Sequence, residues 1–265
     1  MPAVNMLVDA DSIFFKIAYK TTGEKELRTS YDKFCRRMKY TIKERLCNHF
    51  DTEEKFNILY AVKGKDNFRK DLYKPYKSNR PKLDKEISEK LNYLFNYAIS
   101  KGAVAAHGME ADDLVAIWAY EARESDDQYV ICGIDKDLLQ IPGNHYNYTK
   151  DTWQFVDDDQ AHKALMLQCL TGDNTDNIPG LKGIGPKKAE KILQGVPAER
   201  RWNMVKKTWR ESNASLKQLE ISYKLLRMLT TWKDYEDIRA HLYGEGVVSE
   251  QHDVPQQSDQ AEAVH

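Results

Sequence analysis

The chain has few cysteines, and their arrangement excludes several classes of protein. Its 265 residues include four, Cys35, Cys47, Cys132 and Cys169, which lie far apart without a CxxC pair. This spacing is not that of a zinc site, and a disulfide framework is not expected in a chain of this size. We therefore expect a reducing compartment. Cys132 and Cys169 fall in an apolar run and in a helix-like segment, so both are expected in the core.

Long apolar segments are also missing. No run approaches the length that a membrane-spanning helix needs. The first residues, MPAVNMLVDAD, have no basic region and meet Asp9 too early for a signal peptide. An internal repeat and an EF-hand loop are absent from the sequence as well. We expect a cytoplasmic protein without a membrane partner.

The sequence also lacks an excess of one charge sign, because 40 Lys and Arg nearly balance 41 Asp and Glu. Net charge therefore indicates no partner, and only the distribution of charge along the chain can do so. Hydrophobic residues make up 41% of the sequence. This is enough to form a core in one large domain or in a main domain with a smaller appendage.

Segments typical of strands and helices alternate over residues 1–158. Short apolar runs predict strands at 4–8, 56–62, 103–106 and 128–134, and helical spacing predicts helices at 31–50, 83–100 and 111–123. The alternation predicts an α/β fold with a central, mainly parallel sheet flanked by helices. Beyond this region the chain is predicted to be entirely helical. Residues 247–265 are rich in Gln, Asp and Ser and are expected to be disordered.

Acidic residues follow several predicted strands directly. GMEADDLVAIWAY places three carboxylates ahead of a helix, and GDNTDNIPG adds two acids with the spacing of one helical face. Taken alone, such acids cap helices or turns. Because the carboxyl ends of parallel strands share one edge of a sheet, however, we expect the acids to meet on one rim. The eight predicted acids are Asp9, Glu110, Asp112, Asp113, Asp135, Asp137, Asp173 and Asp176.

Eight carboxylates on one rim repel one another unless cations bind or several acids stay protonated. Oxygen-only ligands suit hard divalent cations, so the sequence predicts Mg²⁺ or Mn²⁺. Two such ions close together are typical of phosphodiester hydrolysis. Helix capping is expected to account for one acid of GMEADDLVAIWAY, either Asp112 or Asp113.

Basic residues gather in two segments. Residues 63–85 carry nine Lys or Arg against three Asp, interleaved with Phe68, Tyr73 and Tyr76. A solvated loop has such a composition, and so does a surface for single-stranded nucleic acid.

Residues 182–210 carry nine Lys or Arg against two Glu and contain GIGPKKA. Gly183 and Gly185 predict a tight turn before a helix that begins near Pro186. Backbone N–H groups at such a turn can approach a phosphate, and Lys187 and Lys188 add charge. An ordinary helix–turn–helix with a glycine turn is the alternative.

Taken in order, these motifs resemble the structure-specific 5′ nuclease superfamily: the 5′–3′ exonuclease domain of bacterial DNA polymerase I, bacteriophage 5′ exonucleases and flap endonucleases. The resemblance runs through VDAD, FRKDLYKPYKSNR, GMEADDLVA, GIDKDLLQI and GDNTDNIPGLKGIGPKKA, from about residue 4 to residue 193. No polymerase domain follows in this sequence, and its size is similar to that of the bacteriophage members. We therefore expect a stand-alone enzyme, located in the host cytoplasm if the protein is viral.

The resemblance implies a role for each segment. In a core of residues 1–158, the eight predicted acids would be direct or water-mediated ligands of two Mg²⁺ ions, which Mn²⁺ could replace. A basic arch at 63–100 would carry Lys77 and Arg80 to the scissile phosphate and Tyr76 to stack on a base. Residues 159–246 would bind DNA, with a helix–three-turn–helix (a helix-hairpin-helix relative) at 171–197 that could also hold K⁺. The residues assigned to DNA are Arg69, Lys70, Lys74, Gly183, Gly185, Lys187 and Lys188.

One position departs from the family pattern. Family members commonly carry an Asp at the end of the second strand, where this chain has Val62. Asp66 and Asp11 are the two acids that could take its place. Asp9 is also followed by Ala10 and Asp11, where a Gly is frequent in the family.

The resemblance implies a metal-dependent 5′–3′ exonuclease or flap endonuclease, a hydrolase acting in replication, RNA-primer removal or recombination. We expect a monomer that binds DNA with a 5′ end, flap or nick, or an RNA–DNA hybrid. A DNA-junction binding protein without activity and a PIN-like ribonuclease are the alternatives. The intact Asp135 and Asp137 count against the first, and the basic arch and glycine turn count against the second.

Overall fold

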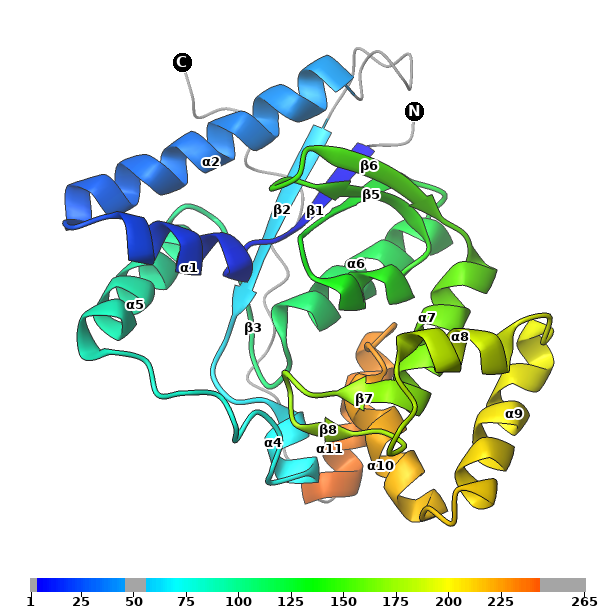
Figure 1. Cartoon of the computed structure of the whole chain (residues 1–265). Helices are drawn as coiled ribbons and strands as arrows, with labels where there is room; N and C mark the ends of the chain where they lie inside the picture. The colour runs from blue at the N-terminus through cyan, green and yellow to red at the C-terminus, as the bar shows by residue number, and fades with distance from the viewer. Residues whose placement is uncertain (1–3, 46–55, 244–265) are drawn as a thin grey trace.

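A six-stranded sheet forms the centre of the protein (Figure 1). The computed structural model describes residues 4–45 and 56–243. The strands lie in the order β3-β2-β1-β4-β5-β6; β1 to β5 run parallel, and β6 runs antiparallel to β5. The predicted α/β class with a mainly parallel sheet is therefore confirmed. The bounds are β1 Val4–Asp9, β2 Phe56–Lys63, β3 Val104–Ala106, β4 Gln128–Cys132, β5 Gly143–Asn147 and β6 Thr152–Val156.

Helices cover both faces of the sheet, which explains why its central strands are apolar runs. Helices α1 (Asp11–Lys20), α2 (Glu24–Arg45) and α5 (Lys85–Ser100) share a first core cluster with one face, and α6 (Ala111–Glu124) shares a second cluster with the other. β1 is buried along its whole length. Its side chains alternate between the two faces, so that Val8 packs in the first cluster and Leu7 in the second.

Some elements differ from the sequence prediction. The hairpin of β5 and β6 was not predicted, because its strands alternate polar and half-exposed residues and contain no apolar run. Helix α2 begins at Glu24, before the predicted start at residue 31. The prediction missed its first turns because their residues are charged rather than apolar. Residues 46–50 of the helix predicted at 31–50, and the tail at 247–265, lie outside the described residues.

The remaining chain is mostly helical. Its helices are α7 Asp158–Thr171, α8 Pro186–Leu193, α9 Ala198–Glu211, α10 Leu216–Leu226 and α11 Trp232–Tyr243. Helices α7 to α10 share a third core cluster, in which Trp209 Nε1 donates to the carbonyl of Cys169 at 3.0 Å. Cys132 and Cys169 are buried, as predicted. Among the described helices, none combines the length and the apolar character that crossing a membrane requires.

The prediction of an entirely helical region after residue 158 is wrong in one place. Strands β7 (Gly172–Asp173) and β8 (Ile178–Pro179) pair antiparallel and enclose a tight turn. Gly172 has a φ of 66°, and a Cβ there would lie 2.3 Å from the backbone nitrogen of Gly180. The close approach of the two strands therefore requires glycine at this position.

Candidate active site

A cleft of about 550 Å³ lies at the carboxyl ends of β1 and β4, between the start of α6 and the turn joining β7 to β8. Seven of the eight predicted acids line it; Asp113 does not. Three cationic side chains, Lys77, Arg80 and Lys136, also line the cleft. We call it the acidic cleft, and its carboxylates are Asp9, Asp11, Glu110, Asp112, Asp135, Asp137, Asp173 and Asp176.

Short local structures orient the acids that follow the strands. Asp9 ends β1 and is buried, and one of its oxygens accepts the backbone N–H of Asp11 at 3.2 Å. Asp135 caps a short 3₁₀ helix (Lys136–Gln140) by accepting the N–H of Asp137 at 2.9 Å. The side chain of Gln168 on α7 donates to Asp137. The acids at these strand ends therefore occupy fixed positions on the cleft wall.

Asp173 and Asp176 reach the acidic cleft from a turn rather than from a helical face, which corrects the interpretation of their spacing. Asp173 Oδ1 accepts the backbone N–H groups of Thr175 at 2.7 Å and of Asp176 at 3.3 Å. Such a side-chain to backbone turn is typical of Asp. It presents the two carboxylates together at the end of β7.

Asp113 points away from the acidic cleft into the protein interior. Its oxygens accept hydrogen bonds from both terminal nitrogens of Arg69, and also from the backbone N–H groups of Glu110 and Leu229 at 3.1 Å each. Arg69 is only 3% exposed. The structure therefore places neither Asp113, predicted as a metal ligand, in the acidic cleft nor Arg69, predicted to contact DNA, on the surface, because the two side chains neutralise each other in the interior. Of the two capping candidates, Asp113 accepts the N–H of the N-cap residue Glu110, and Asp112 accepts the N–H of Asp113 at 2.8 Å.

Lys77 and Arg80 reach the acidic cleft from the turn that follows α4 (Phe68–Leu72). The Lys77 ammonium contacts the Glu110 carboxylate and lies 3.5 Å from Asp176 Oδ2. Arg80 Nη2 lies 2.5 Å from Asp176 Oδ1. Lys77 has a φ of 55°, a left-handed conformation that its N–H stabilises by donating to the carbonyl of Asp176 at 2.9 Å. Both cations are thus placed where a phosphate could meet them.

Tyr76 is buried, and its ring packs in the third core cluster. Its hydroxyl lies 2.7 Å from Glu110 Oε2 and 3.2 Å from Asp176 Oδ2. In this structure the buried ring is not positioned for the predicted stacking on a base. Burial and the Glu110 charge raise the pKa of Tyr76, so the phenol stays neutral and donates its one proton to the nearer carboxylate, Glu110, while it also contacts Asp176.

The segment predicted as an arch, residues 63–100, includes a helix that packs on the sheet. Within it, α5 packs on the sheet through Leu91, Leu94 and Phe95, which belong to the first core cluster. The turn between α4 and α5 is tied to the turn between β7 and β8, since Asn79 Nδ2 donates to the carbonyl of Asn174 at 2.7 Å. The basic segment therefore forms a folded wall of the acidic cleft.

The other residues assigned to DNA lie outside the acidic cleft. Lys70 and Lys74 are exposed on and just after α4. Gly183 has a φ of 76°, and neither it nor Gly185 has an atom within 4 Å of the position of an added Cβ. Lys187 and Lys188 are exposed in the first turn of α8, which begins at Pro186 as predicted. This turn is open to a ligand.

Strand β2 contributes no acid to the acidic cleft. The partner of Asp9 in the parallel ladder is Ala61, whereas Val62 packs in the first core cluster on the opposite face. Residues in register on neighbouring strands point to the same face. The position beside Asp9 is therefore Ala61 rather than Val62. Asp66 is exposed and does not line the acidic cleft.

The acids of the cleft differ in how strongly they hold protons. Burial, followed by repulsion from Asp11, raises the pKa of Asp9 to about 8. Burial likewise raises the pKa of Asp137 to about 6 and that of Asp112 well above its ordinary value. These carboxylates would be more easily ionised with an added cation nearby.

Glu110 shows the opposite shift. Burial alone would raise its pKa, but the positive charges of Arg69 and Lys77 outweigh burial and lower it. For Asp173, the Lys136 ammonium, 2.9 Å away, similarly outweighs burial and lowers the pKa. The protein's own cations therefore favour the ionised form of Glu110 and of Asp173.

The chemistry of this donor set fits hard divalent cations, which prefer carboxylate oxygens. Eight carboxylates face three cationic side chains, so the acidic cleft has an excess of negative charge. In the part of the chain that the structure describes, no three acidic, His or Cys side chains form a ready-made ligand set for one ion. Glu110, Asp176 and Asp173 are instead held by Lys77, Arg80 and Lys136. Ion binding would require these carboxylates to exchange their partners.

Lys136 was not assigned from sequence, and Asp11 was named only as an acid that could replace the one missing from the second strand. Lys136 stands between two acids in GIDKDLL, so its position was a signal that it would lie among them. Asp11 follows Asp9 at the start of α1, where an acid is more often a helix cap. Its place in the cleft depends on the path of the chain after β1.

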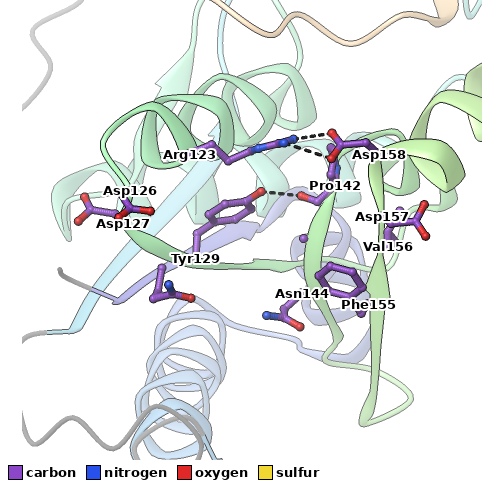
Figure 2. A pocket seen from close by; sticks show the side chains of 12 residues that line it. Arg123, Asp126, Asp127, Tyr129, Pro142, Asn144, Phe155, Val156, Asp157 and Asp158 are labelled. Carbon is purple, nitrogen blue, oxygen red and sulfur yellow. Dashed lines mark hydrogen bonds and ion pairs between the residues drawn. The ribbon is translucent and has the colours of Figure 1, made fainter.

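A second cavity, of about 360 Å³, lies near the starts of β4 and β5 (Figure 2). There Arg123 donates to both carboxylate oxygens of Asp158, at 2.9 and 3.3 Å, and the Tyr129 hydroxyl donates to the carbonyl of Pro142 at 2.7 Å. The cation and the phenol of this cavity are thus engaged within the protein. The acidic cleft remains the candidate active site.

The fold is that of bacteriophage T5 5′ nucleases. The T5 5′-exonuclease with bound zinc ions matches with a TM-score of 0.61 and 19% identity, over 90% of this chain and 93% of that one. The T5 D15 flap endonuclease in a complex with DNA and metal ions matches with a TM-score of 0.59 and 18% identity, over 90% and 92%. At this level of identity the likeness concerns the fold.

The sequence comparison defines the family. The family model described as 5′-3′ exonuclease, N-terminal resolvase-like domain, matches residues 4–166, so the chain belongs to this family. DNA polymerase I of Rhizobium leguminosarum is 36% identical over 148 residues, 52% of this chain and 14% of the polymerase. The 5′-3′ exonuclease of Bacillus subtilis is 33% identical over 147 residues, 49% of each chain. The chain thus spans about half of the exonuclease and a small part of the polymerase.

Proposed function

We propose that the protein is a metal-dependent 5′ nuclease that hydrolyses phosphodiester bonds of DNA near 5′ ends and branch junctions. The observation that carries this proposal is the acidic cleft, with its eight carboxylates and with Lys77 and Arg80 at its wall. Membership of the 5′-3′ exonuclease family and the likeness to T5 nucleases support the same activity. The proposal covers both exonuclease and flap-endonuclease action.

The seven sequence-predicted acids that line the acidic cleft would hold two divalent cations, either Mg²⁺ or Mn²⁺. When bound, such ions activate water and stabilise the leaving oxygen in phosphodiester hydrolysis. Tyr76 would keep Glu110 and Asp176 in place through its two hydroxyl contacts. Gln168 would do the same for Asp137.

Lys77 and Arg80 would neutralise the charge that develops on the scissile phosphate. Both are held by Asp176, and Lys77 also by Glu110, so they are already oriented toward the acidic cleft. A phosphate entering the cleft would become a new counter-ion for the two cations. The expected products carry a 5′-phosphate and a 3′-hydroxyl.

We propose that residues 1–158 form the nuclease core and residues 159–246 the DNA-binding region. The open turn at Gly183 and Gly185 would receive a backbone phosphate of the duplex, with Lys187 and Lys188 nearby. Residues 171–197 would also bind K⁺. Lys70 and Lys74 would meet the strand with the 5′ end. Contacts to phosphates carry little sequence information, so base sequence should matter little. The protein would act as a monomer, with RNA–DNA hybrids as further substrates.

Cleavage of three substrates tests the proposal: a 5′-flap duplex, a blunt duplex and single-stranded RNA, each with Mg²⁺ or EDTA. We expect Mg²⁺-dependent release of 5′-phosphorylated products from the flap duplex. Asp135→Asn should reduce the rate at least about a hundredfold. Asp126→Asn, an exposed acid beside the second cavity, is the matched control and should retain the wild-type rate. Absence of metal-dependent cleavage on every DNA would overturn the proposal, and preferential cleavage of RNA would indicate a PIN-like ribonuclease.

A further inference from the structure

Asp11 lines the acidic cleft from the start of a helix rather than from the end of a strand. It is the first residue of α1, two positions beyond the end of β1, yet its carboxylate reaches across to the end of β2. There Asp11 Oδ1 accepts the backbone N–H of Lys63 at 2.8 Å. The connection is fixed by a further bond, in which the N–H of Ala10 donates to the carbonyl of Ala61 at 3.0 Å.

The end of β2 would otherwise carry no negative charge. Ala61 is the residue of β2 that shares the face of Asp9, and Val62 packs on the other face. The carboxylate of Asp11 lies over this end of the strand and lines the acidic cleft beside Asp9. In effect, α1 supplies the carboxylate that β2 does not.

Helix capping does not account for this placement. Asp9, not Asp11, accepts the first free N–H of α1, at 3.2 Å, and the N-cap residue Ala10 has no capping side chain. Asp11 Oδ2 accepts no hydrogen bond from the residues that the structure describes. One oxygen is therefore anchored to the backbone while the other remains for a ligand in the cleft.

The charges around Asp11 offset its negative charge only in part. Asp9 and Glu110 repel it. Lys63 and Lys77 attract it, but the Lys63 ammonium lies over the ring of Phe95, 4.3 Å from its centroid. The Lys77 ammonium contacts Glu110. A carboxylate in this position costs stability unless a cation joins it.

We propose that Asp11 is a further ligand, direct or through water, of a divalent cation bound in the acidic cleft beside Asp9. The proposal rests on the nuclease function proposed above, whose metal site it extends by one acid. The start of α1 would thus supply a metal ligand that the end of β2 cannot supply, because Ala61 and Val62 have no carboxylate. Asp11 thereby completes the set of carboxylates on the β2 side of the cleft.

Binding of Mn²⁺ to the DNA-free protein, followed by calorimetry and by the electron paramagnetic resonance of free Mn²⁺, tests this proposal. Asp11→Asn keeps the size of the side chain and the oxygen that faces the N–H of Lys63. We expect it to weaken binding at the affected position about tenfold or more, or to remove one bound equivalent. Asp66→Asn is the matched control, since Asp66 is exposed outside the acidic cleft, and should bind Mn²⁺ as the wild type does.

Thermal unfolding in EDTA separates a ligand role from a structural one. Asp11→Asn removes repulsion with Asp9 and Glu110, so a ligand role predicts a higher Tm than wild type in EDTA and a smaller upward shift on adding Mn²⁺. A structural role predicts a lower Tm in EDTA and an unchanged Mn²⁺ shift, which would overturn the proposal. Asp11→Glu is the second variant. It keeps the charge but moves it by one methylene, and we expect it also to weaken Mn²⁺ binding.

Wild-type Mn²⁺ affinity in both Asp11 variants would overturn the role of Asp11 while leaving the nuclease proposal intact, provided that the wild-type protein cuts the flap duplex. If the wild-type protein itself neither binds Mn²⁺ nor cleaves DNA, the proposed function fails, and the extension fails with it. The two failures are therefore distinguishable in the same set of measurements.

Discussion

Arg69 and Asp113 lie together in the protein interior, with Arg69 Nη2 2.8 Å from Asp113 Oδ1. Arg69 also donates to the carbonyl groups of Leu225 at 2.8 Å and Arg227 at 3.1 Å. The pair therefore connects α4 and the start of α6 with the end of α10 and the segment that follows it. Since α6 begins at the acidic cleft, this buried ion pair fixes the cleft relative to the C-terminal helices.

Removing one partner of this pair should destabilise the protein strongly. Asp113→Ala leaves the buried Arg69 charge without its counter-ion, and we expect the free energy of unfolding to fall by about 3–5 kcal/mol. The double variant Arg69→Met/Asp113→Leu should be less destabilised than the sum of its single variants. Urea unfolding measures both. Asp158→Asn, which breaks the exposed pair with Arg123, is the control, with an expected change below about 1 kcal/mol. Additive effects at Arg69 and Asp113 would contradict this prediction.

Tyr76→Phe distinguishes positioning from stacking, because it removes the hydroxyl but keeps the ring. The hydroxyl contacts Glu110 and Asp176, so we expect a loss of about tenfold in Mn²⁺ affinity and in the cleavage rate at limiting metal. Saturating metal should restore part of the rate. A ring that stacked on a base would make Tyr76→Phe equivalent to wild type, and this result would favour the stacking role predicted from the sequence.

Lys77→Ala should slow cleavage much more than it weakens DNA binding. Lys77 lies within the acidic cleft, and loss of a charge that stabilises the reacting phosphate is expected to lower the rate about a hundredfold. Single-turnover rates and affinities for the flap duplex, the latter measured in Ca²⁺, give the comparison. Lys74→Ala is the control; its side chain is 80% exposed, and it should reduce affinity with little change in rate. Equal losses of rate and affinity for Lys77→Ala would place this lysine in the binding surface instead.

The lysines of α8 should contribute to affinity through charge. Lys187→Ala and Lys188→Ala are each expected to weaken duplex binding uniformly across base sequences and to reduce the salt dependence by about one phosphate contact. The cleavage rate at saturating DNA should be unchanged, because these residues lie outside the acidic cleft. Fluorescence anisotropy at several salt concentrations measures the slope. Lys150→Ala, exposed after β5, is the control; an equal effect there would indicate nonspecific attraction.

Local sequence was sufficient for the parts of the fold that apolar patterning determines. The runs ending at Asp9 and preceding Asp135 predict buried strands, and the topology of parallel sheets brings their carboxyl ends to one edge. The β5–β6 hairpin lacked such a signal, because its residues alternate between partial burial and exposure. Gly172 lies in a strand pair that depends on a close backbone approach, which no spacing rule anticipates.

Which of two neighbouring acids lines the cleft and which points inward could not be predicted, because the answer depends on residues far away in the sequence. Asp112 and Asp113 are adjacent on α6, so their side chains point about 100° apart, one into the acidic cleft and one inward. Which points inward is determined by Arg69, 44 residues earlier. Tyr76 is similarly buried by helices more than 80 residues away in sequence. Sequence spacing brings acids to a rim but does not specify the rotation of each side chain.

The raised pKa values of the cleft acids should make metal binding and stability depend on pH. Burial and repulsion from Asp11 raise the pKa of Asp9 to about 8, and burial raises that of Asp137 to about 6. In the unfolded chain an Asp titrates near about 3.9. Without metal, the folded protein therefore holds protons between these values that the unfolded chain has released. Its free energy of unfolding should fall as pH rises from about 4 to 8, by at most about 1.4 kcal/mol per pH unit for each such proton.

Thermal unfolding of the wild type and of Asp9→Asn between pH 5 and pH 8 isolates this effect, because all other groups titrate in both proteins. In EDTA, Asp9→Asn should gain stability relative to wild type as pH rises, since it removes the carboxylate that is costly to ionise. In Mg²⁺, the wild type should be stabilised more at pH 8 than at pH 6, because protons no longer compete with the ion for Asp9 and Asp137. The same increase should be much smaller in Asp9→Asn. A Mg²⁺-induced shift in Tm that is independent of pH in the wild type would show that these carboxylates do not bind the ion.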